Sequence, residues 1–135
     1  MTCEEFNAFC QSLQATSHVV QWGGAHVWKV GGQKNGDAAQ QAAGLAGAKV
    51  FAIGGWDKAH PAITFKVSHI GFEMLREQAG LRPAPYLASR GLKWIQHFAP
   101  PGLPDDELKA CLAQSHRIVS LGLSKKMQQA LGLNL

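Results

Sequence analysis

The sequence predicts a single α+β domain, a two-layer α/β sandwich in which helices pack on an antiparallel sheet. Its 135 residues are about the length of one domain, so we assign residues 1–135 to one unit. Short β-prone segments separated by glycine pairs fill much of the region from residue 18 to residue 67. Segments with the apolar spacing of helices stand on either side of that region.

The first element is predicted to be an amphipathic helix over residues 3–13. Thr2 followed by Glu5 matches the capping-box pattern that begins many helices. Apolar residues then recur at helical spacing, namely Phe6, Phe9, Cys10 and Leu13.

Four strands are predicted next, over residues 18–22, 25–30, 49–53 and 63–67. In the last of them Ile63, Phe65 and Val67 alternate with Thr64 and Lys66, the period of a strand with one buried and one solvent-exposed face. An antiparallel meander is the simplest arrangement of these segments. Residues 33–48 interrupt it with a low-complexity stretch in which only Leu45 has an apolar side chain large enough to anchor it, and this stretch predicts a flexible inserted loop.

The second half predicts a helix, a stiff connection, a strand and two further helices. Ser68 caps a helix with an apolar edge that ends at Gly80, and this edge is Phe72, Leu75 and Ala79, widened by Met74. Pro83 and Pro85 then stiffen an extended connection before a strand over residues 92–98. A long helix begins near Pro104 and ends at Gly122, with an inner face of Leu108, Leu112, Ser115 and Val119. Ser124 caps a last short helix.

The charge balance favours an anionic partner without requiring one, because the formal net charge is +4 and the sequence pI is about 9.2. Glu4 and Glu5 near the start do not suit a secretory signal, and no apolar run approaches the ~18 residues of a membrane span. We therefore expect a cytoplasmic protein with no membrane association. The three cysteines, Cys3, Cys10 and Cys111, form no C-x-x-C pair and predict no disulfide framework.

A carboxylate-free interval between Gln78 and Pro104 is the strongest indication of a binding site. Its charged residues are Arg82, Arg90 and Lys93, with Tyr86 and Trp94 among them. Basic side chains neutralise phosphates and aromatic rings stack on bases, so this combination predicts weak, salt-sensitive binding of DNA. The full predicted set adds two strand lysines and comprises Lys29, Lys66, Arg82, Tyr86, Arg90, Lys93 and Trp94.

An equally weighted interpretation of these residues is that the basic side chains are simply solvated and the aromatic ring among them belongs to the core. Trp94 decides much of this, because Trp94 and Ile95 point to opposite faces of one strand and the sequence leaves open which of them is buried.

The sequence predicts neither catalysis nor a metal or other cofactor. Ser115 and His116 are neighbours on a helix and project about 100° apart, which prevents them from acting as nucleophile and base. No nucleophile elbow or phosphate-binding glycine motif is present. The six histidines lack ligand spacing and predict no metal site: His18, His26, His60, His69, His97 and His116.

The chain resembles the MmcQ/YjbR family of small bacterial proteins over nearly its whole length. The most specific part is PAPYLASRG followed by KW after the middle helix, and EEFNAFCQSL, HVVQWGGAHVWKVGG and KVFAIGGW add to the likeness. The resemblance implies a secretion-chaperone-like or frataxin-like sheet and a DNA-binding role described as a double wing. The sequence departs from the family pattern at residues 33–48.

The alternative to DNA binding is a non-enzymatic protein-interaction module or homodimer, with Trp22, Trp28 and Trp56 on an apolar sheet surface.

Overall fold

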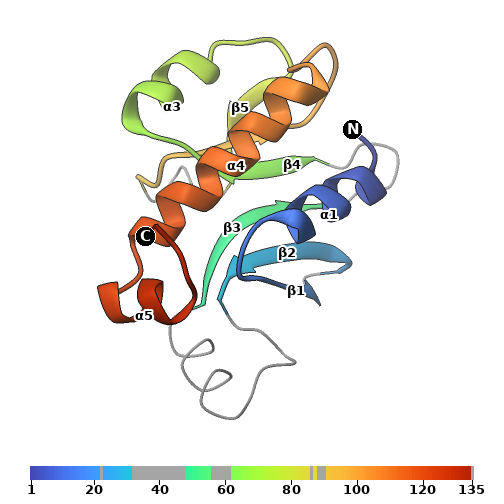
Figure 1. The fold of residues 1–135 in the computed structure, drawn as a ribbon. Helices are drawn as coiled ribbons and strands as arrows, with labels where there is room; N and C mark the ends of the chain where they lie inside the picture. Colours follow the sequence, from blue (N-terminus) through green and yellow to red (C-terminus); the bar gives the residue numbers. More distant parts are fainter. Residues whose placement is uncertain (22, 32–47, 56–61, 86, 88–90, 135) are drawn as a thin grey trace.

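The computed structural model describes residues 1–21, 23–31, 48–55, 62–85, 87 and 91–134, and its helices and strands follow the predicted order (Figure 1). The helices are α1 (Cys3–Ser12), α3 (His69–Leu75), α4 (Asp105–Leu121) and α5 (Lys125–Ala130). The strands are β1 (Thr16–Gln21), β2 (Ala25–Val30), β3 (Lys49–Gly54), β4 (Ile63–Lys66), β5 (Leu81–Pro83) and β6 (Trp94–His97). The predicted insert lies outside the described residues, apart from Ala48.

The six described strands form one sheet in the order β1-β2-β3-β4-β6-β5, and every neighbouring pair is antiparallel. The meander predicted for the first four strands is therefore confirmed. The stiff connection predicted after Gly80 is instead the edge strand β5, whose Arg82 pairs with Gln96. Proline is tolerated there because the outer side of an edge strand needs no backbone donor, so Pro83 ends the strand without breaking a ladder.

The helices pack on one face of the sheet, so the α+β two-layer prediction is confirmed. α1 and α4 lie side by side over the sheet, and α3 lies beside β5 and β6 (Figure 1). Phe6 of α1, Phe51 and Phe65 of the sheet, and Leu108 and Leu112 of α4 are fully buried in one cluster. The capping box at Thr2 and the inner face of α4 are as predicted. None of the described helices is long and apolar enough to span a membrane.

Ser115 of α4 forms two hydrogen bonds with the sheet next to a β-bulge in β3. Trp28 pairs with Ala52 and Lys29 pairs with Val50, so Phe51 is the extra residue. The hydroxyl of Ser115 donates to the Phe51 carbonyl oxygen at 2.6 Å and accepts the backbone N–H of Lys66 at 2.8 Å. Ser115 therefore satisfies one backbone group of β3 and one of β4, next to the bulge in the β2–β3 pairing.

The predicted exposed face of β4 is wrong, because Thr64 is only 1% exposed. Thr64 lies opposite Gln96, which is 5% exposed, and its hydroxyl accepts a hydrogen bond from the Gln96 amide at 3.4 Å. Polar side chains that hydrogen-bond one another can be buried at little cost. On the same face Ala25, Val27 and Ile53 form a second buried apolar cluster.

Two smaller features concern the edge of α3 and the cysteines. The apolar edge of α3 is narrower than predicted: Phe72 is buried, but Met74 is 66% exposed and the helix already ends at Leu75. All three cysteines are free thiols, and Cys10 is buried in the core.

Candidate nucleic-acid interface

Three basic residues lie on the face of the sheet opposite α1 and α4, which we call the second face. Directly paired residues of an antiparallel sheet point to the same side, so Arg82, Gln96, Thr64, Ile53 and Val27 form one row across that face. The second-face cluster of Val27 and Ile53 is separate from the core under the helices. Arg82 therefore projects away from the helical layer.

Lys66 and Lys29 join Arg82 on the second face because side chains on a strand alternate. Lys66 lies two residues from Thr64 on β4, and Lys29 lies two residues from Val27 on β2. Lys66 is two strands away from Arg82 in one direction and from Lys29 in the other. Since adjacent strands are about 4.8 Å apart, the backbone of Lys66 is at least roughly 10 Å from the backbone of each of the other two residues.

No ion pair within the described part of the chain involves Lys29, Lys66 or Arg82. Arg82 is exposed, and the two lysines are half-buried. Their positive charges are therefore not neutralised by any described carboxylate, which is the condition that an anionic partner requires.

Lys93 lies on the other face of the sheet from Arg82, so the predicted set does not form one surface. Its ammonium is 4.7 Å from the centre of the Phe72 ring, which packs in the core on the helical side. The guanidinium of Arg76 lies 5.3 Å from the centre of the same ring. Lys93 thus packs against Phe72 of α3 as a cation over an aromatic ring.

The aromatic part of the predicted site is not supported where the structure describes it. Trp94 is 8% exposed, so its ring is buried and has no free surface on which a base could stack. Tyr86 and Arg90 lie outside the described residues. The sequence left open whether Trp94 or Ile95 is buried, and in the structure both are.

Two contacts fix the side chain of Arg82. Its Nε–H donates to Oε1 of Gln96 at 2.8 Å, and its Cζ lies 4.4 Å from the centre of the Phe98 ring. Gln96 is itself oriented by the hydrogen bond from its amide to Thr64. The two terminal nitrogens of the guanidinium form no described hydrogen bond or ion pair.

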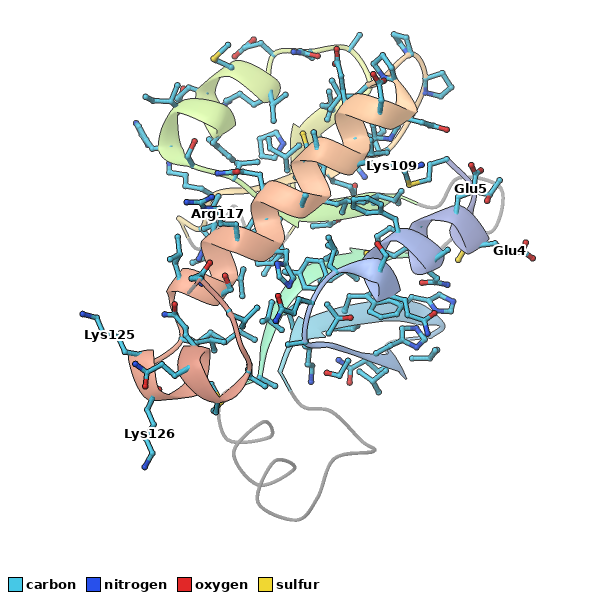
Figure 2. The ribbon with its side chains drawn as sticks, viewed as in Figure 1. Glu4, Glu5, Lys109, Arg117, Lys125 and Lys126 are labelled. Atoms are coloured by element: carbon cyan, nitrogen blue, oxygen red, sulfur yellow. The ribbon has the colours of Figure 1, made fainter. Side chains whose placement is uncertain are left out.

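A second group of exposed basic residues lies on the helical side, outside the predicted site. Figure 2 shows Lys109 and Arg117 on α4, and Lys125 and Lys126 projecting from α5. Glu4 and Glu5 lie at the beginning of α1. These helical cations are useful as a charge-matched comparison for the second face.

Two of the histidines predicted to be scattered are in contact. Nε2 of His18 lies 2.8 Å from Nδ1 of His26, and the two rings are stacked across the β1–β2 hairpin. Trp28, which is buried, stacks against His18 and donates its indole N–H to Asn7. No group of three or more potential metal ligands occurs among residues that the structure places. The sequence did not show this pair because the contact depends on the hairpin register.

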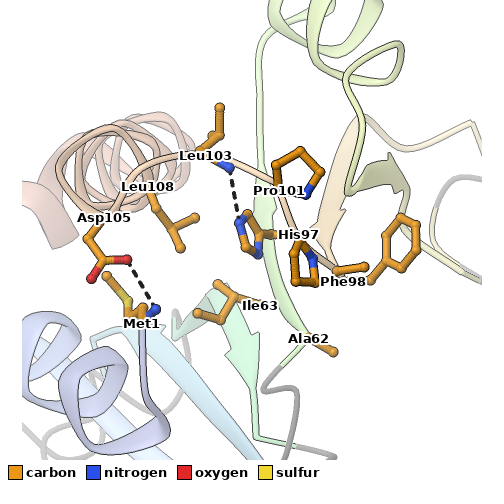
Figure 3. A pocket seen from close by; sticks show the side chains of 11 residues that line it. Met1, Ala62, Ile63, His97, Phe98, Pro101, Leu103, Asp105 and Leu108 are labelled. Atoms are coloured by element: carbon orange, nitrogen blue, oxygen red, sulfur yellow. Dashed lines mark hydrogen bonds and ion pairs between the residues drawn. The ribbon is translucent and has the colours of Figure 1, made fainter.

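A cavity of about 280 Å³ lies where β4, β6 and the start of α4 meet (Figure 3). His97 accepts the Leu103 N–H at Nε2, at 3.1 Å, and burial lowers the pKa of His97 below its ordinary value. The Met1 amine pairs with Asp105 at 3.0 Å at the same cavity. The other lining residues named in Figure 3 are mainly apolar. The His97 ring, which must be unprotonated at Nε2 to accept the Leu103 N–H, thus lies between the sheet and the loop before α4.

The fold defines a class of small α+β proteins with a single antiparallel sheet and helices on one side. The family model described as YjbR matches residues 11–118, and the chain belongs to the YjbR family. The crystal structure of Deinococcus radiodurans protein DR2400, described with the family-model domain DUF419, is similar in fold. Its TM-score is 0.76 at 21% sequence identity, covering 98% of this chain and 88% of that chain. None of the curated proteins matches the sequence.

Proposed function

We propose that this protein is a non-enzymatic, weak DNA-binding domain that uses Lys29, Lys66 and Arg82. The observation that carries the proposal is that these three cations share the second face of the sheet and have no ion-pair partner among the described residues. Two further points support the proposal. The net charge is +4, and the resemblance to the MmcQ/YjbR family implies a DNA-binding role described as a double wing.

The spacing of the three cations suits a polymer better than a small anion. Because Lys29 and Arg82 are four strands, or roughly 19 Å, apart, the three side chains cannot all contact one phosphate, but they can contact separate phosphates along a backbone. Such contacts carry no sequence information, because sequence is recognised through base edges rather than phosphates. We therefore propose binding that tolerates many sequences.

A titration of labelled duplex and single-stranded DNA at two salt concentrations tests the proposal. Three phosphate contacts, at about 0.9 each, give an expected slope of about −2.7 for log Kobs against log salt with duplex DNA. The expected dissociation constant is in the range ~10⁻⁴ to 10⁻⁶ M. Absence of binding at low salt, or affinity that does not depend on salt, contradicts the proposal.

A second candidate function is self-association through α3. Ile70 and Met74 are 71% and 66% exposed and lie four residues apart, so they are neighbours on one side of this helix. Exposed apolar neighbours of this kind are typical of protein contact sites. The predicted tryptophan surface does not support this candidate, because Trp28 is buried and Trp22 and Trp56 lie outside the described residues.

Light scattering after gel filtration separates the two candidates. A stable dimer that becomes monomeric when Ile70 and Met74 are changed to serine supports self-association through α3. A monomer at all concentrations contradicts it and leaves the second face as the proposed functional surface.

A further inference from the structure

The side chain of Arg82 is held from two directions, unlike the two lysines of the second face. Gln96 receives its Nε–H, and the Phe98 ring lies under its guanidinium plane. Arg82 and Gln96 point to the second face because they are directly paired, and the Phe98 ring, just beyond the end of β6, contacts the guanidinium there. The contacts therefore orient the guanidinium on this face.

The remaining donors of Arg82 are those that bind a phosphate best. An arginine side chain has five N–H donors, and Gln96 uses the single donor on Nε. The four donors on the two terminal nitrogens form a fork that matches two oxygens of one phosphate. No described side chain occupies this fork, and Arg82 itself is exposed on edge strand β5.

We propose that Arg82 forms a preorganised phosphodiester subsite, with Gln96 and Phe98 as its positioning residues. This inference rests on the proposed DNA-binding function and assigns one phosphate of the bound strand to Arg82. A guanidinium that is already oriented loses less side-chain freedom on binding than a free lysine or arginine does. Lys66 and Lys29 then supply attraction to other phosphates without fixing their position.

The subsite is first tested without DNA, by nuclear magnetic resonance of the Arg82 Nε–Hε group. Dimethyl phosphate is the probe, because it carries a single phosphodiester and no base or sugar. The expected result is a saturable shift of the Arg82 Nε–Hε signal that is weakened in Q96M and in F98L. A linear, unsaturable shift, or an equal shift in the wild type and both variants, overturns the inference. Sodium acetate at the same ionic strength tests whether a carboxylate binds as well, and an equal response to it overturns the assignment to phosphate.

The second test measures DNA affinity and its salt dependence in the same variants. Replacing Gln96 by methionine removes the acceptor for Nε at similar volume, and replacing Phe98 by leucine removes the ring. Both variants keep the charge of Arg82, so we expect affinity to fall several-fold while the salt slope remains that of the wild type. Arg82→Ala should weaken binding and also reduce the slope by about 0.9, as one phosphate contact is lost. Arg82→Lys keeps the charge but not the fork, and should bind more weakly than the wild type with an unchanged slope.

The outcomes distinguish this inference from the proposed function. If the wild type does not bind DNA, the proposed function fails, and the dimethyl phosphate experiment still tests the subsite. If the wild type binds DNA and Arg82→Ala weakens it, but Q96M, F98L and Arg82→Lys all bind like the wild type, the positioning role is overturned. F98L provides an independent answer if Q96M does not fold, because Gln96 is buried whereas Phe98 is only partly buried.

Discussion

The hydroxyl of Ser115 in α4 donates a hydrogen bond to the backbone carbonyl oxygen of Phe51 in β3, at 2.6 Å. The same hydroxyl accepts the N–H of Lys66 in β4, so one side chain from the helical layer joins two strands. Lys66 is also one of the three cations of the second face. The packing of α4 on one side of the sheet therefore fixes the backbone of a residue that projects from the other side.

Replacing Ser115 by alanine should lower the free energy of unfolding by about 1–3 kcal/mol, because two backbone groups lose their buried partner. Urea denaturation followed by circular dichroism measures this change. Ser120→Ala is a useful control, since the Ser120 hydroxyl donates to the Arg117 carbonyl oxygen and accepts from the Asn134 side chain but joins no strands. A loss below about 0.5 kcal/mol for Ser115→Ala would show that water replaces the hydroxyl without cost.

Gly80→Ala should destabilise the fold strongly. Gly80 has φ +89, and a Cβ there would lie 2.1 Å from the Ala99 carbonyl oxygen and 2.6 Å from the Gly102 nitrogen. We expect a loss of about 3 kcal/mol or more, because backbone atoms cannot move aside as a flexible side chain can.

Gly91→Ala is the matched control for Gly80→Ala. Gly91 also has a positive φ, +77, but a Cβ there would meet nothing within 4 Å. The cost should therefore be limited to the backbone conformation, roughly 1–2 kcal/mol. Equal losses in the two variants would contradict the close packing between Gly80 and the loop that follows β6.

The stability of the protein should fall as the pH is lowered below about 6.5, in part because of His97. Its folded-state pKa lies below 6.5, chiefly because burial disfavours the charged ring, and the Leu103 N–H also requires an unprotonated Nε2. The unfolded chain then binds more protons than the folded one, so the free energy of unfolding decreases until the pH reaches the folded pKa.

The variant His97→Gln should show a smaller decrease in stability between pH 7 and lower pH than the wild type, as measured by urea denaturation at each pH. His69→Gln is the control, because it makes the same substitution at an exposed histidine. Parallel pH profiles for the wild type and His97→Gln would contradict this role of His97.

Local sequence patterns were sufficient for most of the helices and strands. The inner face of α4 follows from helical spacing, and the start of α1 follows from Thr2 and Glu5, because both depend on residues within a few positions of each other. The edge strand β5 was missed, since its two neighbouring prolines suggest a connection and only its pairing with β6 makes it a strand. The Ser115 contact was missed because a bulge in a distant strand creates it.

The candidate site was predictable only in part for the same reason. The carboxylate-free interval predicts Arg82, whereas Lys29 and Lys66 join the predicted set only as lysines on strands. Which cations share a face depends on the register between strands, and that register separates Lys93 from Arg82. The burial of Trp94 was likewise not predictable, because period-two alternation does not say which side chains of a strand are covered.

The most direct test of the proposed function compares two charge-matched triple variants in one DNA titration at low salt. Changing Lys29, Lys66 and Arg82 to glutamine removes three charges from the second face, and changing Lys109, Lys125 and Lys126 to glutamine removes three from the helical side. Both variants lower the formal net charge from +4 to +1, since 4 − 3 = 1. We predict at least a tenfold loss of affinity for the second-face variant and less than a twofold change for the helical variant. Equal losses in the two variants, or a larger loss in the helical one, would contradict the assignment of DNA binding to the second face.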